Sequence, residues 1–264
     1  MSTDVVRARH VGFVHDLITV AGRGLRSIPR DPEGTIPPMI IGAFFFAVNI
    51  AALGPLAESA QEPGFDFKAF QLPTAIIFSI TGVSRASTLV QDIDGGYFDR
   101  LLATPVNRLA LLLGLMVADF TLAVCLCIPV MILALILGVS FAAGIGGMLL
   151  FLLIAGLWGL SFTGFLYAVA LRTGSPAAVN SGFLIFFPFA FLTTSFLPKE
   201  NLSDGLAAIS EWNPVTYVLE GLRSLVMTGW DAGALAATLA AILIVGVLSM
   251  SLALAALRGR VSRG

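Results

Sequence analysis

A single carboxylate, Asp119, stands inside an apolar run that extends from residue 109 to residue 137. In a helix that starts at Arg108, Asp119 would lie about 16 Å along the axis, close to the middle of a bilayer. A central aspartate costs about 2.5–3.5 kcal/mol on insertion, which the 17 Leu, Ile, Val and Phe residues of the run offset. A carboxylate at this depth is a candidate for a polar point in a substrate pathway or dimer seam. The alternative is a structural hydrogen bond between helices.

A second group of polar residues lies in the stretch 91–108, QDIDGGYFDRLLATPVNR. Gly95 and Gly96 interrupt the helix before them, and Pro105 disfavours helix at the preceding residue. One or two helical turns fit in between, and they carry both apolar and charged side chains. The pattern favours a short helix on the membrane surface that docks a partner, although a plain loop is the alternative. The docking residues would be Phe98, Asp99, Arg100, Leu101 and Leu102.

A third group of polar residues lies in the connection 198–232, which holds aromatic residues suited to a membrane interface. Asn213 can cap a helix and Pro214 suits its first position, so a helix is predicted to start here. Apolar residues then recur on one face, and Glu220 and Arg223 are spaced for an ion pair. The helix is too short to span. We expect it to enter the outer leaflet and return, and the alternative is a helix that lies flat on the surface.

The sequence holds no motif for catalysis or nucleotide binding. A phosphate loop needs a lysine after a glycine, and neither Lys68 nor Lys199 follows one. Cys125 and Cys127 would point in different directions on a helix, which disfavours a disulfide or a metal site. The net charge of −1 disfavours nucleic-acid binding. We therefore expect no catalytic residue, no metal site and no cofactor bound by this chain.

The elements that position these residues follow from composition. The chain is 57% hydrophobic and 12% charged, with a mean hydropathy of +0.94, so much of its apolar surface must face lipid. The apolar runs are continuous rather than alternating, which predicts helices rather than a barrel. The expected fold is an all-α membrane protein whose transmembrane domain, 35–257, is followed by a short tail, 258–264. Its six predicted transmembrane helices are 35–56, 70–89, 109–137, 148–171, 177–197 and 233–257.

The basic residues predict the orientation. Eleven basic residues fall on one side of the predicted membrane and three fall on the other. Both termini are therefore expected in the cytoplasm. The expected location is the plasma membrane or inner membrane of the cell. Arg85, inside the second span, is expected to extend to the interface. The segment 1–34 shows no signal peptide and is predicted to form a basic amphipathic helix at the interface, either as an anchor or as a docking element.

Four stretches resemble type-2 ATP-binding-cassette exporter permeases, and in particular the daunorubicin-resistance permease group. They occur in the right order within about residues 23–257. The stretches are RDPE at 30–33, GYFDRLLATPVNR at 96–108, FLTTSFLP at 191–198 and WNPVTYVLEGLR at 212–223.

The resemblance implies a subunit that exports an amphipathic small molecule, antibiotic or lipid. Two six-span subunits, as a homodimer or a heterodimer of paralogues, would each rest on a separate ATPase subunit that binds ATP and Mg. The residues from Phe98 to Leu102 would form the helix that couples to this ATPase, and Arg172 would lie in a second contact. The outer gate would include Asn213, Pro214, Tyr217, Glu220 and Arg223.

Two other interpretations stay open. The first is a permease for polysaccharide or glycolipid export. The second, from another class, is an ion-coupled carrier or a membrane scaffold that acts alone. A carrier would be expected to show internal repeats or several intramembrane charges, and the sequence shows only Asp119 at depth.

Overall fold

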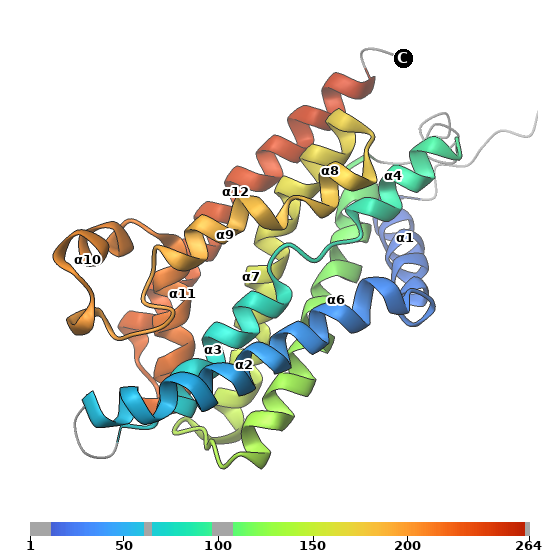
Figure 1. Ribbon diagram of the computed structural model, residues 1–264. Helices are drawn as coiled ribbons and strands as arrows, with labels where there is room; N and C mark the ends of the chain where they lie inside the picture. Colours follow the sequence, from blue (N-terminus) through green and yellow to red (C-terminus); the bar gives the residue numbers. More distant parts are fainter. Residues whose placement is uncertain (1–11, 61–64, 97–107, 262–264) are drawn as a thin grey trace, which may run out of the picture.

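A computed structural model describes residues 12–60, 65–96 and 108–261, and every regular element in this part of the chain is helical (Figure 1). The longer elements are α1 (Phe13–Ser27), α2 (Pro32–Ala60), α3 (Phe67–Ile80), α4 (Ala86–Asp94), α6 (Arg108–Ile136), α7 (Gly144–Thr173), α8 (Pro176–Asn180), α9 (Phe183–Phe191), α10 (Asp204–Glu211), α11 (Pro214–Arg223) and α12 (Ala232–Val261). Short turns of other helix types cover Ile28–Arg30, Lys199–Asn201 and Ser224–Thr228.

Four helical stretches among the described residues are long and apolar enough to cross a membrane. They confirm the prediction of an all-helical membrane protein and correspond to the first, third, fourth and sixth predicted spans. The stretches are Gly34–Ala57, Ala110–Ile136, Gly144–Thr173 and Ala232–Gly259.

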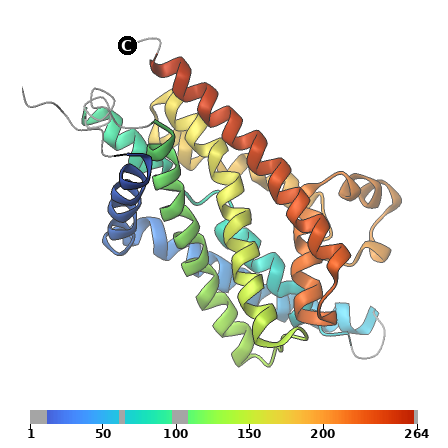
Figure 2. The ribbon, with the colours of Figure 1, turned by 180° about the vertical axis from the view of Figure 1, so that it is seen from behind.

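Helices α6, α7 and α12 lie side by side, with α7 between the other two (Figure 2). Small residues allow the backbones to approach. A Cβ on Gly159 of α7 would lie 2.9 Å from the Cβ of Ala123 in α6, and one on Gly164 would lie 2.5 Å from Oγ of Ser249 in α12. Close packing of this kind holds membrane helices together where lipid is as apolar as the side chains.

The second predicted span, 70–89, is not one helix. Helix α3 ends at Ile80 and α4 begins at Ala86, and Gly82 between them has φ of 88°, a conformation that glycine adopts without strain. The prediction of a continuous helix here is wrong, because a backbone turn that depends on distant residues interrupts the apolar run.

The fifth predicted span, 177–197, is also divided. Helices α8 and α9 are separated by a turn, and residues 192–198 are not helical. Pro188 inside α9 lacks the amide hydrogen of a helical residue. The interruptions after α3 and α9 place non-helical backbone among apolar helices. The N–H and C=O groups of this backbone therefore need hydrogen-bond partners within the protein.

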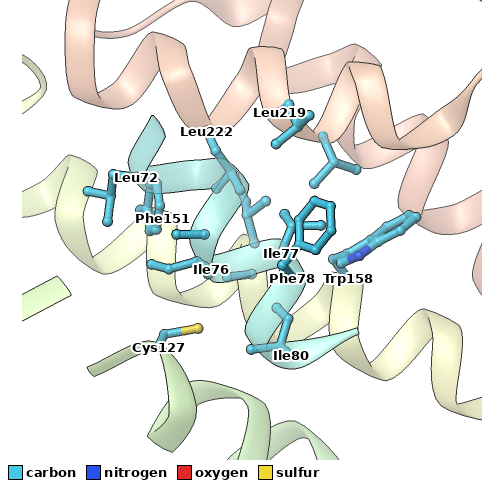
Figure 3. Packing of buried hydrophobic residues seen from close by; sticks show 14 of the residues in the cluster. Leu72, Ile76, Ile77, Phe78, Ile80, Cys127, Phe151, Trp158, Leu219 and Leu222 are labelled. Atoms are coloured by element: carbon cyan, nitrogen blue, oxygen red, sulfur yellow. The ribbon is translucent and has the colours of Figure 1, made fainter. Parts of the chain in front are cut away.

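Helix α3 lies at the centre of the core and is buried along nearly its whole length. Figure 3 shows its apolar side chains between α6, α7 and α11. On the α2 and α9 side, the ring of Phe78 stacks on Phe45 with centroids 4.7 Å apart and contacts Phe186 and Phe191 edge to face. The central helix of the core therefore precedes the first interruption and contacts α9, the helix that precedes the second.

Candidate functional site

Asp119 joins three helices at the gap between α3 and α4. It is 2% exposed, and its Oδ1 accepts a hydrogen bond of 2.7 Å from the backbone N–H of Arg85. Its Oδ2 accepts bonds from the hydroxyls of Ser84, at 3.0 Å, and of Tyr167 in α7, at 2.6 Å. We call Ser84, Arg85, Asp119 and Tyr167 the Asp119 junction.

The position of Asp119 has a direct physical reason. The first amides of a helix have no partner within that helix, and they attract negative charge. Arg85 is the residue that precedes α4, and Asp119 from α6 accepts its amide hydrogen. The hydroxyl of Ser84 also accepts the N–H of Ala86, at 3.1 Å. A carboxylate from another helix thus caps the start of α4.

Arg85 is buried instead of extending to the interface as predicted. Its side chain is 4% exposed, and Nη1 forms an ion pair of 2.7 Å with Oδ2 of Asp31, immediately before α2. Its Nε and Nη2 atoms have no hydrogen-bond partner in the described part of the chain. The turn before α4 directs this side chain toward the start of α2. The prediction assumed that Arg85 lies in a continuous helix, and this assumption is wrong.

Two further contacts fix the elements around this gap. On the α3 side, Trp158 Nε1 of α7 donates to the hydroxyl of Thr81 at 2.9 Å. On the α4 side, Nη2 of Arg23 in α1 forms an ion pair of 2.6 Å with Oδ1 of Asp92. Helix α4, which precedes the segment 97–107 in the sequence, is therefore bonded to α1.

Arg223, at the end of α11, forms hydrogen bonds to the non-helical segment that follows α9. It is 8% exposed. Its Nη1 donates to Oγ1 of Thr194 at 3.0 Å, and Nη2 donates to the carbonyls of Thr194 and Ser195 at 2.8 and 3.4 Å. In α3, Nε donates to the carbonyl of Phe70 and Nη2 to the hydroxyl of Thr74, both at 3.2 Å. Its Cζ also lies 3.5 Å from the centre of the Phe70 ring.

We call Phe70, Thr74, Thr194, Ser195 and Arg223 the Arg223 junction. The hydroxyl of Thr74 also donates to the carbonyl of Ser195 at 2.9 Å. The guanidinium group thus donates hydrogen bonds to backbone carbonyls of the non-helical segment that follows α9. The anticipated ion pair between Glu220 and Arg223 is not formed, because Glu220 is exposed while Arg223 turns inward.

Asn213 attaches the other end of α11 to the same segment. Its Oδ1 accepts from the amide of Val215 at 3.0 Å, which confirms the predicted helix cap. Its Nδ2 donates to the carbonyls of Phe189 and Leu192 at 2.6 and 2.9 Å. Both ends of α11 are therefore bonded to residues 189–195. The predicted apolar face is buried, through Val215, Val218, Leu219 and Leu222.

The remaining predicted outer residues lie in α11. Pro214 is the first residue of α11, and the hydroxyl of Tyr217 donates to the carbonyl of Glu211 at 2.6 Å. A cavity of about 380 Å³ beside Arg223 is lined by both acidic and basic side chains. Its charged lining residues are Lys199, Glu200, Glu220, Arg223 and Asp231.

An exposed ion pair lies near the rim of this cavity. Nζ of Lys199 lies 2.7 Å from Oε1 of Glu211. This hydrogen bond raises the pKa of Lys199 above its ordinary value of 10.5 and lowers the pKa of Glu211 below its ordinary value of 4.5.

The structure separates the predicted residues into different places. Asn213 and Arg223 bond to residues 189–195 from the two ends of α11, and the hydroxyl of Tyr217 bonds instead to Glu211. Asp119 lies in the other junction, and Arg172 is exposed in the last turn of α7. The predicted docking residues lie outside the described residues; they are Phe98, Asp99, Arg100, Leu101 and Leu102. Sequence reasoning missed Ser84 and Tyr167, whose hydroxyls inside apolar runs were the available signal.

Comparison with known proteins identifies relatives of the chain. Residues 15–227 match the family model of the ABC-2 type transporter. The chain is also 26% identical over 187 residues to the daunorubicin resistance ABC transporter permease protein DrrB1 of Streptomyces coeruleorubidus. That alignment covers 68% of this chain and 64% of the relative, so the chain spans less than two thirds of the relative's length.

Proposed function

The chain belongs to the ABC-2 type transporter family, and on this premise we propose that it is the membrane subunit of an exporter powered by a separate ATPase subunit. The family match carries the proposal, because it extends from α1 through α11 and includes both junctions. The four long apolar helices agree with a multi-pass membrane protein. We further propose that α3 and α9, with the segments that follow them, complete six membrane passages.

The proposed orientation places the termini and the segment 91–108 in the cytoplasm, with α10 and α11 on the outer side. The basic residues support this arrangement. The ATPase would contact the residues from Phe98 to Leu102, and Arg172 would contribute a second contact. The bond between Arg23 and Asp92 supports a coupling role for α1, because it joins α1 to the helix that leads into this segment.

Helix α3 offers a physical link between the two sides. One of its ends leads to the Asp119 junction, and its first turns supply Phe70 and Thr74 to the Arg223 junction. We propose that movement of α4, caused by the ATPase, changes the Asp119 junction and shifts α3 along its axis. This shift would reach α11 through Arg223, so the outer gate would respond to events on the cytoplasmic side.

The proposed substrate is an amphipathic small molecule, an antibiotic or a lipid, moved outward by two copies of the permease or by a pair of paralogues. The name of the relative, which refers to resistance to daunorubicin, supports an antibiotic. In this proposal Asp119 serves the pathway indirectly by setting the angle between α3 and α4. The alternative role as a substrate contact would require the buried junction to open.

Co-purification tests the ATPase partner. The full chain is expected to retain an ATPase with a phosphate loop, encoded by a neighbouring reading frame. In the reconstituted complex, Asp99→Ala with Leu101→Ala is expected to abolish stimulation of ATP hydrolysis by substrate. The matched control is Asp204→Ala with Leu206→Ala in α10, on the other side of the proposed membrane. Stimulation that survives in the first variant would contradict the proposed coupling segment.

A further inference from the structure

An apolar groove runs along the face of the bundle formed by α6, α7 and α12, the three helices prominent in Figure 2. Helix α7 forms its floor, and α6 and α12 form its walls. Its volume is about 720 Å³, within the roughly 300–1,000 Å³ typical of ligand sites. Its lining includes Leu17, Met116, Phe120, Ser161, Gly246 and Val247.

The lining of the groove offers a ligand almost no hydrogen bonds. Among the described residues, its only polar side chains are Ser161 and Ser251, and both hydroxyls donate to carbonyls of their own helices, those of Trp158 and Val247. An apolar cavity of this kind favours hydrocarbon, because a polar ligand would lose its hydrogen bonds to water without replacement. The chemistry of the groove therefore matches an acyl chain.

Positive charge lies beyond one end of the groove. Arg258 is seven residues past Ser251, so it continues the same stripe of α12 two turns farther along. Arg172 of α7 lies near the same level, since Leu171 and Leu257 pack in one cluster. Both arginines are exposed, and neither forms an ion pair within the described residues. Arginine near a membrane surface attracts anionic lipid headgroups.

We propose that this groove binds an acyl chain of an anionic phospholipid whose phosphate lies at Arg258. A second copy of the chain is a less suitable occupant. In a dimer with its twofold axis along the membrane normal, the contact would bring Arg258 of both copies to the same side, where like charges repel. The site differs from both junctions.

Native mass spectrometry of the purified full chain tests this site with two probes, dioleoyl phosphatidylglycerol and dioleoyl phosphatidylcholine. The wild type is expected to retain one phosphatidylglycerol in preference to phosphatidylcholine. Gly246→Leu fills the groove and is expected to lower lipid retention about fivefold or more. Arg258→Gln is expected to weaken retention of phosphatidylglycerol about fivefold and to leave that of phosphatidylcholine unchanged.

Two further variants of α12 serve as controls for the folding and the added bulk of Gly246→Leu. Ala240→Leu introduces the same side chain at an exposed position of α12 outside the groove and is expected to retain lipid as the wild type does. If Gly246→Leu does not fold, Ser251→Phe fills the groove from an exposed position of α12. Wild-type retention in a folded groove-filling variant would overturn the proposal. So would a dimer in the wild type that these variants convert to monomers, since a second copy would then occupy the groove.

Discussion

The Asp119 junction and the Arg223 junction both provide hydrogen-bond partners for backbone groups at the end of a helix, and they do so with side chains of opposite charge. Each lies where a predicted span stops being a helix. At the first, a carboxylate accepts the N–H that precedes α4. At the second, a guanidinium group donates to carbonyls that follow α9. Backbone donors and acceptors need partners wherever lipid excludes water, and the sign of the side chain follows from which end of a helix is left open.

The two junctions differ in how completely they are bonded. Arg223 uses all three guanidinium nitrogens and also lies over the Phe70 ring. In the Asp119 junction, two nitrogens of Arg85 have no partner among the described residues. The Arg223 junction is thus expected to be the more rigid of the two, and the Asp119 junction the one that rearranges.

Removing Arg223 is expected to have the largest effect. Arg223→Met deletes five hydrogen bonds and leaves the carbonyl of Thr194 without a described donor, which should cost about 3–5 kcal/mol of stability. Thermal unfolding of the purified full chain measures the loss. The exposed Arg26 provides a control, since Arg26→Met should change stability by less than about 0.5 kcal/mol. Equal stability of the two variants would refute the bonding described for Arg223.

Changes at Asp119 are expected to rank second. Asp119→Leu removes the acceptor for three donors and should cost about 2–4 kcal/mol, whereas Asp119→Asn keeps one oxygen and should cost less. Transport is expected to fall in the same order, because the angle between α3 and α4 depends on this cap. If both variants are as stable and as active as the wild type, the residue is merely tolerated.

Tyr167→Phe separates the hydroxyl from the rest of the Asp119 junction. It deletes one buried hydrogen bond and is expected to cost about 0.5–1.5 kcal/mol. Thr121→Val is a control in α6, because the Thr121 hydroxyl bonds only within its own helix. A loss in Tyr167→Phe as large as that in Asp119→Leu would show that the tyrosine, rather than the carboxylate, holds the helices together.

The exposed pair of Lys199 and Glu211 is expected to have the smallest effect. Because the pKa of Glu211 is lowered in the folded protein, its contribution is present above about pH 4.5 and is lost as the pH falls below it. The difference in melting temperature between the wild type and Glu211→Gln should therefore be small near neutral pH and vanish in acid. A difference that persists at about pH 3 would exclude this pair as its source.

The sequence predicted the helices more readily than their interruptions. Long apolar runs predict α2, α6, α7 and α12, and Asn213 followed by Pro214 predicts α11. The gap after α3 depends on Asp119, far along the chain, and the end of α9 depends on Arg223. A local pattern cannot contain such partners. Gly82, followed by Ser84 and Arg85, was the available hint at the first gap.

The attachment of α11 at both ends has a mechanical consequence. Asn213 and Arg223 close a loop of covalent and hydrogen bonds that runs from residue 189 to residue 223. Because hydrogen bonds join both ends of α11 to residues 189–195, we expect this part of the chain to move as one unit. Gly229 lies outside this loop, between Arg223 and the start of α12, and its φ of 102° and ψ of −145° are open only to glycine. A larger residue at Gly229 is therefore expected to strain the connection to α12 and to leave the hydrogen bonds of the loop intact.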